Sequence, residues 1–257
     1  MKQKSILLKS IENSKNANNT EPIAAIKAVE NVQAPRVGLL GNFIIGVAAS
    51  SRGLGCTHTC IALANYIKKN NSKVAVVEKS TRKHFIELYN EEYKDGLLEN
   101  SFSINGVDYY PYNSHSIFEI LNAGYDYIIL DLSVIRYKDE KGKAIITEQY
   151  TEMQRANKQI LVGGIKDWQI NDLGFSLGGE SSHNFELYIT FCDKDKFSDF
   201  RNMIDRKAYF APFCPDPFNE YEIQNNVFSE MLKDVMITNK GKSSNSNRKG
   251  LSKILRR

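Results

Sequence analysis

Short apolar segments that alternate with helix-like segments constrain the fold of this 257-residue chain more than any other feature. A short continuous apolar run is typical of a strand that is buried on both faces. Segments 57–70 and 116–125 instead have the apolar spacing of helices. This alternation predicts an α/β fold, a single domain in which helices cover both faces of a mainly parallel sheet in three layers. The expected strands lie at residues 43–50, 73–78, 106–112, 125–132, 159–164, 187–191 and 208–213.

The two ends of the chain differ in charge from its middle. Residues 239–257 contain seven Lys and Arg and no acid, and residues 1–36 contain six basic and three acidic residues. Because the whole chain has a net charge of only +4, the intervening residues are net acidic, which argues against a basic nucleic-acid groove there. We therefore divide the chain into an N-terminal extension (1–40), a folded domain (41–238) and a basic C-terminal tail (239–257).

Several classes of protein are excluded by composition. The sequence has no apolar run of the ~18 residues that a transmembrane helix needs, and its first residues lack the apolar core of a signal peptide. The four cysteines have no C-x-x-C spacing, which argues against a disulfide scaffold or a zinc site. His58 and His84 likewise lack the spacing of metal ligands. We expect a cytoplasmic globular protein. Residues 23–33 of the extension predict a short amphipathic helix, which either packs on the domain edge or binds a partner.

The loop ASSRGLGCTHT at residues 49–59 joins the first expected strand directly to a helix. Backbone N–H groups at such a helix start can hold a phosphate without help from side chains. Gly53 and Gly55 give this loop the backbone freedom it needs, and the Thr57 hydroxyl stands where it could coordinate magnesium. The loop therefore predicts a phosphate site, unless it is retained only because the fold needs a tight strand-to-helix turn.

This loop resembles the deviant Walker A motif of the ParA/MinD family of P-loop proteins, G-K-G-G-x-G-K-[ST]. Aligned without gaps, Gly53, Gly55 and Thr57 match the motif. The resemblance implies a P-loop NTPase-like fold with ATP and Mg²⁺ as cofactors. Four positions depart from the motif: Ser50, Ser51, Arg52 and Cys56 replace a glycine, the signature lysine, a second glycine and the phosphate-binding lysine.

The same resemblance implies a set of site residues. Asp131, at the end of YDYIILD, takes the place of the Walker B aspartate and is the catalytic candidate if the protein is active. Magnesium would be held by Thr57, Glu78 and Asp131, although Ser80 stands where the family has a second acid. In an active enzyme, Lys79 or Lys166 would replace the lost lysine. The implied nucleotide-binding residues are Arg52, Gly53, Gly55, Cys56, Thr57 and His58.

The absence of the two motif lysines predicts weak nucleotide binding and slow or absent hydrolysis. In a working P-loop the lysine stabilises charge on the β- and γ-phosphates during transfer. Losing one such preorganised donor costs about 2–4 kcal/mol of transition-state stabilisation. We therefore expect weak nucleotide binding and slow or absent hydrolysis. Cys56 itself, at a helix start, is expected to be an unusually acidic thiol open to redox sensing, or else a small residue that fills the space of the lysine.

Two later loops are candidates for contacts with the base or with a second subunit. Segment 163–173 contains Lys166 and the single tryptophan, Trp168, which either lines such a face or packs internally. Segment 210–218 contains three prolines, and the resemblance places it where the family contacts adenine.

The basic tail predicts a membrane contact. Leu251, Ile254 and Leu255 fall on one face of a short helix, with Lys253 and Arg256 on the rest of its surface. This pattern resembles the membrane-targeting tail of MinD, and two tails in a dimer would bind an anionic bilayer better than one. The alternatives are a solvated tail or a nucleic-acid contact.

These features together predict a degenerate ParA/MinD-like protein that acts as a localisation or assembly factor at the inner face of the membrane. The degenerate loop and the tail are similar to those of the TadZ/CpaE group, which implies a role in pilus or secretion machinery. A homodimer, protein partners in a membrane assembly and peripheral membrane binding follow from the same resemblance. An active ParA-type partition ATPase and a nucleic-acid-associated protein remain the alternatives.

Overall fold

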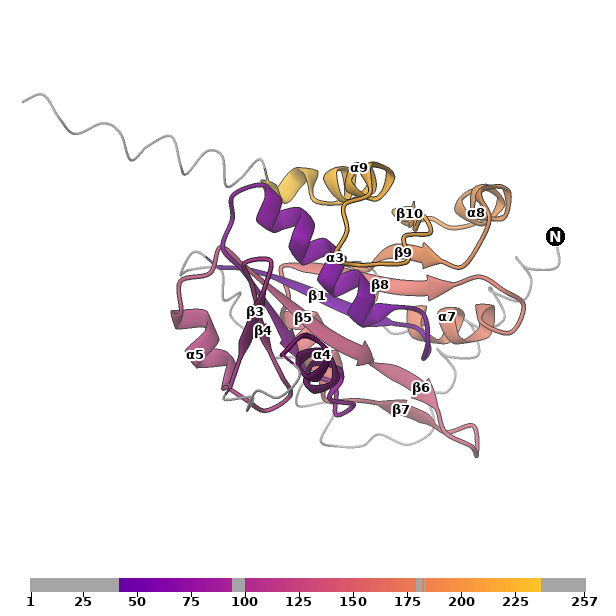
Figure 1. Ribbon diagram of the computed structural model, residues 1–257. Helices are drawn as coiled ribbons and strands as arrows, with labels where there is room; N and C mark the ends of the chain where they lie inside the picture. The colour runs from indigo at the N-terminus through magenta and orange to yellow at the C-terminus, as the bar shows by residue number, and fades with distance from the viewer. Residues whose placement is uncertain (1–41, 94–99, 179–181, 183, 237–257) are drawn as a thin grey trace, which may run out of the picture.

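A twisted sheet with helices on both faces forms the part of the chain that the computed structural model describes, residues 42–93, 100–178, 182 and 184–236 (Figure 1). Its strands hydrogen-bond in the order β10–β9–β8–β1–β5–β2–β4–β3. Every neighbouring pair is parallel except β3 and β4, which are antiparallel. The strands span Phe43–Ala49 (β1), Val74–Glu78 (β2), Phe102–Ile104 (β3), Val107–Tyr110 (β4), Tyr127–Val134 (β5), Lys158–Gly164 (β8), Glu186–Thr190 (β9) and Ala208–Phe210 (β10).

Helices complete the outer two of the three layers. The first strand shows how the layers are built, because Ile45 and Val47 pack into the core under α3 while Ile44 and Ala48 pack into the core on the opposite face. Helices α3, α4 and α9 contribute buried residues to the first core, and α5, α6, α7 and α8 contribute to the second. The helices span Cys56–Lys69 (α3), His84–Tyr93 (α4), Ile117–Asn122 (α5), Gln149–Arg155 (α6), Ile170–Leu177 (α7), Lys194–Arg201 (α8) and Glu222–Met231 (α9).

The structure confirms the expected three-layer, mainly parallel α/β architecture and adds short strands that the sequence pattern did not predict. One is β3, which pairs with β4 at the edge of the sheet. The others are β6 (Arg136–Lys138) and β7 (Ala144–Ile146), which form a hairpin beyond the end of β5 (Figure 1). Each of these strands has only three residues, too few to show a hydrophobic period.

Two predicted terminal elements lie outside the described residues: the helix at 23–33 and the basic tail at 239–257. Within the described residues, no helix combines the length and apolar character needed to cross a bilayer.

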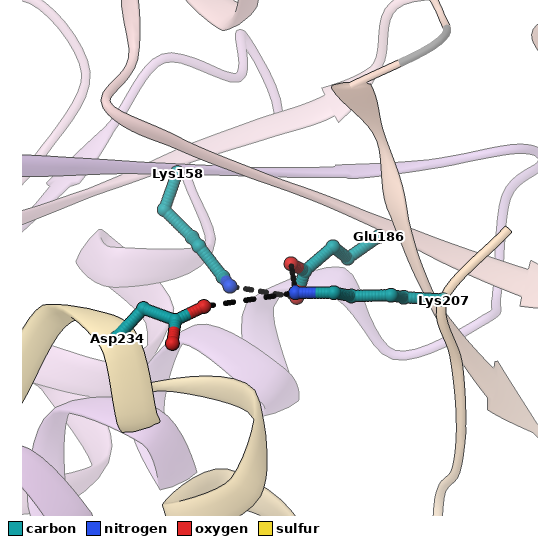
Figure 2. A network of polar contacts seen from close by, with 4 residues as sticks. All are labelled: Lys158, Glu186, Lys207 and Asp234. Atoms are coloured by element: carbon teal, nitrogen blue, oxygen red, sulfur yellow. Dashed lines mark hydrogen bonds and ion pairs between the residues drawn. The ribbon is translucent and has the colours of Figure 1, made fainter.

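A network of charges joins the amino ends of three adjacent strands (Figure 2). Lys158 opens β8 and pairs with Glu186, which opens β9, at 2.7 Å between Nζ and Oε2. Lys207, just before β10, lies 3.4 Å from Glu186 and 3.7 Å from Asp234, which follows α9. The side chains of Lys158 and Glu186 are only 10% and 14% exposed, whereas those of Lys207 and Asp234 are 61% and 80% exposed. The network thus has a largely buried pair at its centre and exposed charges at its rim.

Candidate functional site

The loop between β1 and α3 has the backbone geometry of a phosphate site. Gly53 and Gly55 have φ values of 77° and 85°, in the left-handed region where any other residue is strained. Gly55 immediately precedes α3, no side chain caps that helix start, and its first turn contains no acid. The first N–H groups of α3 are therefore left for another acceptor, at the end of the helix where its dipole favours an anion.

Two neighbouring strands hold this loop in place. The backbone N–H of Ser50 donates to the Val162 carbonyl of β8 at 2.9 Å. The Thr190 hydroxyl of β9 donates to the Leu54 carbonyl at 3.1 Å, and the Leu54 side chain is buried. The loop is thus fixed by the sheet before any ligand arrives, which lowers the entropy cost of binding one.

Asp131 lies directly beneath the loop, because β5 is paired with both β1 and β2. Its buried carboxylate accepts a hydrogen bond from the Thr57 hydroxyl at 2.6 Å and one from the Cys56 thiol at 3.2 Å. It also accepts from the backbone N–H of Ser133 at 3.3 Å. The structure therefore brings together Thr57 and Asp131, two of the three residues expected to hold magnesium.

Glu78, the third expected magnesium residue, is buried at the end of β2. Its two carboxylate oxygens accept from the backbone N–H groups of His84, at 2.7 Å, and Tyr112, at 3.3 Å. Burial raises the pKa of Glu78, and these two hydrogen bonds partly oppose that rise. Glu78 thus positions the start of α4, and its role as a metal ligand stays a prediction.

A cavity of about 580 Å³ opens beside the loop. Phe191, Phe213 and Gln224 are among the residues that line it, and 83% of Phe213 is exposed. Phe213 belongs to the proline-containing segment that was expected to contact a base. The loop end of the cavity is lined by every residue that the sequence assigned to nucleotide binding, namely Arg52, Gly53, Gly55, Cys56, Thr57 and His58.

Arginines, rather than the lysines considered from sequence, supply positive charge at the cavity. Arg52 and Arg82 both line it, and both also line an adjoining cavity of about 690 Å³ that extends to the β6–β7 hairpin. Lys79 and Lys166 line neither cavity. Sequence reasoning did not select Arg82, which follows β2 in the chain, and only the position of β2 in the sheet brings it to the loop.

The expectation of an acidic thiol at Cys56 is wrong. The pKa of Cys56 is raised well above its usual value, first by its hydrogen bond with Cys60, and then by burial and by the negative charge of Asp131. A helix start favours a thiolate, but here burial and the carboxylate outweigh it. Cys56 also donates to the Val47 carbonyl at 3.3 Å, as a neutral thiol does. Of the two roles considered for Cys56, the structure thus favours that of a small residue that fills the space of the lysine over that of a redox sensor.

The thiols on α3 should therefore react slowly with alkylating agents. Burial raises the pKa of Cys60 to about 11, so at pH 8 its thiolate fraction is about a hundredfold below that of an ordinary cysteine. We expect iodoacetamide, with EDTA present, to label Cys60 at least about a hundredfold more slowly than free cysteine, and Cys56 also more slowly, measured by peptide mass mapping. The urea-unfolded chain is the control. Labelling of native Cys56 faster than free cysteine would contradict the assignment of a neutral thiol.

Trp168 is an exposed residue rather than an internal packing one. Its side chain is 72% exposed, after the carboxyl end of β8, and the Lys166 ammonium lies 5.4 Å from the ring centroid. It does not line the cavity beside the loop. The interpretation of Trp168 as a core residue is therefore wrong, and a role at a subunit contact stays a prediction.

Comparison with solved structures shows which fold this is. A plasmid partition protein from Borrelia burgdorferi B31 bound to AMPPNP is similar, with a TM-score of 0.55 and 15% identity over 77% of this chain and 99% of that one. The MinC:MinD cell division complex of Aquifex aeolicus gives 0.53 and 14%, over 84% and 99%. The septum site-determining protein MinD of Pyrococcus horikoshii OT3, complexed with Mg-ADP, gives 0.50 and 14%, over 76% and 96%.

Comparison of the amino-acid sequence, without the structure, finds no matching protein-family model and no matching curated protein. The structural likeness nevertheless extends over nearly the whole length of the proteins compared, and the loop, α3 and the strand that carries Asp131 follow one another in the order that the motif requires. This chain has the fold of the ParA/MinD ATPases.

Proposed function

We propose that this protein is a weakly nucleotide-binding, ParA/MinD-like localisation or assembly factor at the inner face of the membrane. One observation carries the nucleotide part: the uncapped start of α3, with its two left-handed glycines, opens onto a cavity that continues to exposed aromatic residues. Such a start attracts phosphate, and an aromatic wall suits a base. ATP with Mg²⁺ is the proposed ligand, because similar structures contain AMPPNP and Mg-ADP.

Hydrolysis is proposed to be slow at most. Cys56 occupies the place of the phosphate-binding lysine, and its thiol is neutral and bonded to Asp131. Arg52 and Arg82 can attract phosphate from the cavity mouth, but both side chains are exposed, so water screens their charge. Preorganised charge is the main source of rate in phosphoryl transfer, and this loop has lost its preorganised cation.

A subunit contact across the loop face is part of the proposal. Trp168, Phe191 and Phe213 follow the carboxyl ends of β8, β9 and β10, which are neighbours in the sheet, and each side chain is more than half exposed. Aromatic residues gathered on one edge are typical of a protein interface. A dimer formed there would present two basic tails to an anionic bilayer, and protein partners of a membrane assembly, such as pilus or secretion machinery, would bind the assembled form.

Membrane binding by the tail can be tested with vesicles. We expect the full chain with ATP and Mg²⁺ to co-sediment with vesicles that contain phosphatidylglycerol, and a chain that ends at residue 238 to stay in the supernatant. Replacing Leu251 and Ile254 with serine keeps the tail's charge and should reduce binding at least about threefold, because the apolar face is lost. If this variant binds as the wild type does, the tail acts by charge alone and the proposed role of its apolar face is wrong. If the full chain stays in the supernatant, the membrane proposal fails, and a polyanion such as nucleic acid is favoured instead.

A further inference from the structure

Two thiols and a carboxylate meet inside the domain, directly behind the loop. Cys56 and Cys60 are one helical turn apart on α3, so both project from the same face toward β5. Asp131 of β5 lies opposite them. The two sulfur atoms and a carboxylate oxygen all lie within 4.8 Å of one another. Among the described residues, no other group of three such donors comes this close together.

The separations in this cluster suit a tetrahedral metal ion. With Zn–S bonds of about 2.3 Å and Zn–O bonds of about 2.0 Å, two ligands at the tetrahedral angle lie about 3.5–3.8 Å apart. The Cys56 sulfur is already 3.2 Å from a carboxylate oxygen of Asp131. Because all three donor atoms lie within 4.8 Å of one another, shifts of up to about 1 Å would place both sulfurs and this oxygen around one ion. The spacing of the cysteines in the sequence argued against a zinc site of C-x-x-C type, but a pair on one helical turn needs only a third ligand from another element.

The cluster can be reached by an ion, and a hydroxyl group lies nearby that could serve as a fourth ligand. Cys56 and Thr57 line the 580 Å³ cavity, so an ion can reach the cluster from solvent. The Thr57 hydroxyl lies 2.6 Å from the second carboxylate oxygen of Asp131 and 3.2 Å from Nδ1 of His84. This hydroxyl or a water could therefore be the fourth ligand of the ion. His84 would then act as a hydrogen-bond partner of that ligand.

We propose that Cys56, Cys60 and Asp131 bind one thiophilic divalent cation of the Zn²⁺ type. Binding forms two metal–thiolate bonds and one metal–carboxylate bond, and the two thiol protons leave to solvent. No electron is transferred. The Cys56 sulfur lies within hydrogen-bond distance of the Val47 carbonyl and of Asp131, an arrangement that suits a protonated thiol before the cation binds. The site shares Cys56, Thr57 and Asp131 with the proposed nucleotide and magnesium site, but none of its bonds involves a phosphate, so it can form without a nucleotide.

Cobalt titration of the full, reduced chain without nucleotide tests this site directly. Co²⁺ bound by two thiolates gives an intense sulfur-to-metal absorption band in the near ultraviolet and visible bands of tetrahedral intensity. We expect both to saturate at one equivalent, two protons to be released per ion, and Zn²⁺ to bleach the bands. Cys60→Ser should weaken Co²⁺ binding by more than about a hundredfold, because loss of an outer-shell partner alone costs about 10–100-fold.

Matched variants separate this site from the other thiols and from unfolding. Cys192 and Cys214 line the same cavity but lie outside the cluster, so Cys192→Ser and Cys214→Ser should leave the titration unchanged. Asp131→Asn keeps both thiols and should weaken binding at least about tenfold, with the fold checked by circular dichroism. The absence of a sulfur-to-cobalt band in the wild type would overturn the proposal. A band that survives Cys60→Ser, or that is lost in either control, would overturn it too.

Discussion

Replacing Asp131 with alanine should lower the free energy of unfolding by about 3 kcal/mol and abolish magnesium-dependent nucleotide binding. The fully buried carboxylate accepts from the Thr57 hydroxyl, the Cys56 thiol and the Ser133 N–H, and alanine removes this shared acceptor. The thiol keeps the Val47 carbonyl and the hydroxyl keeps Nδ1 of His84 as partners, which compensate only part of the loss. Each unsatisfied buried donor costs about 1–3 kcal/mol, and the weak thiol donor lies at the low end. Because Thr57 lies in the first turn of α3, the loop geometry that holds phosphate should loosen as well.

Urea unfolding at constant m-value, together with calorimetry in ATP and Mg²⁺, measures both effects of this substitution. Asp126→Ala is the matched control, because Asp126 precedes the same strand, is exposed and accepts the Lys73 N–H at 2.7 Å. That variant should lose about 1 kcal/mol and bind nucleotide as the wild type does. Equal losses in the two variants, with nucleotide binding intact in both, would show that Asp131 does not organise the loop.

Replacing Glu186, at the amino end of β9, with alanine should lower the free energy of unfolding by a comparable amount. This substitution leaves Lys158, whose side chain is only 10% exposed, without the carboxylate that pairs with it at 2.7 Å (Figure 2). Breaking a buried pair by removing one partner costs about 3–5 kcal/mol, because the remaining charge stays desolvated. We expect a loss of about 3 kcal/mol in urea unfolding, since neither side chain is fully buried.

Two exposed lysines provide controls for this second prediction. Lys207→Ala removes a rim cation from the same network, and Lys69→Ala removes an ion pair with Glu220 in which both side chains are more than half exposed. Each control should cost less than about 1 kcal/mol. Losses of similar size in all three variants would mean that burial of the central pair contributes nothing. Of the cavity residues, Thr190 ends β9 and Phe191 follows it, so Glu186→Ala should also weaken nucleotide binding.

The sheet could be predicted from sequence because its strands are buried on both faces. Apolar runs such as residues 43–50 and 159–164 have no other stable place in a chain of this size. The phosphate loop could be predicted for a different reason. Gly53 and Gly55 stand where the backbone needs positive φ, so the local sequence alone specifies that turn.

The rest of the candidate site depends on strand order, which the sequence pattern does not specify. Asp131 lies 75 positions from Cys56 in the chain and meets it only because β5 is inserted between β1 and β2. The hydrogen bond with Cys60, burial and the negative charge of Asp131 raise the pKa of Cys56, where the helix start alone predicted the opposite direction. Strand order likewise brings Arg82 to the cavity, from the loop that follows β2, whereas Phe213 belongs to segment 210–218, which the resemblance had already placed near the base.

Calorimetric titration of the full chain with ATP and Mg²⁺ tests most directly whether the loop is still a phosphate site. We predict saturable binding at one site per chain with a Kd between about 10 µM and 1 mM, corresponding to about −7 to −4 kcal/mol. Thr57→Ala, which removes the hydroxyl beside Asp131, should weaken binding at least about tenfold, and Thr57→Ser, which keeps it, should bind as the wild type does. No saturable heat at millimolar ATP, or equal affinity in Thr57→Ala, would contradict the assignment and leave the loop as a structural turn.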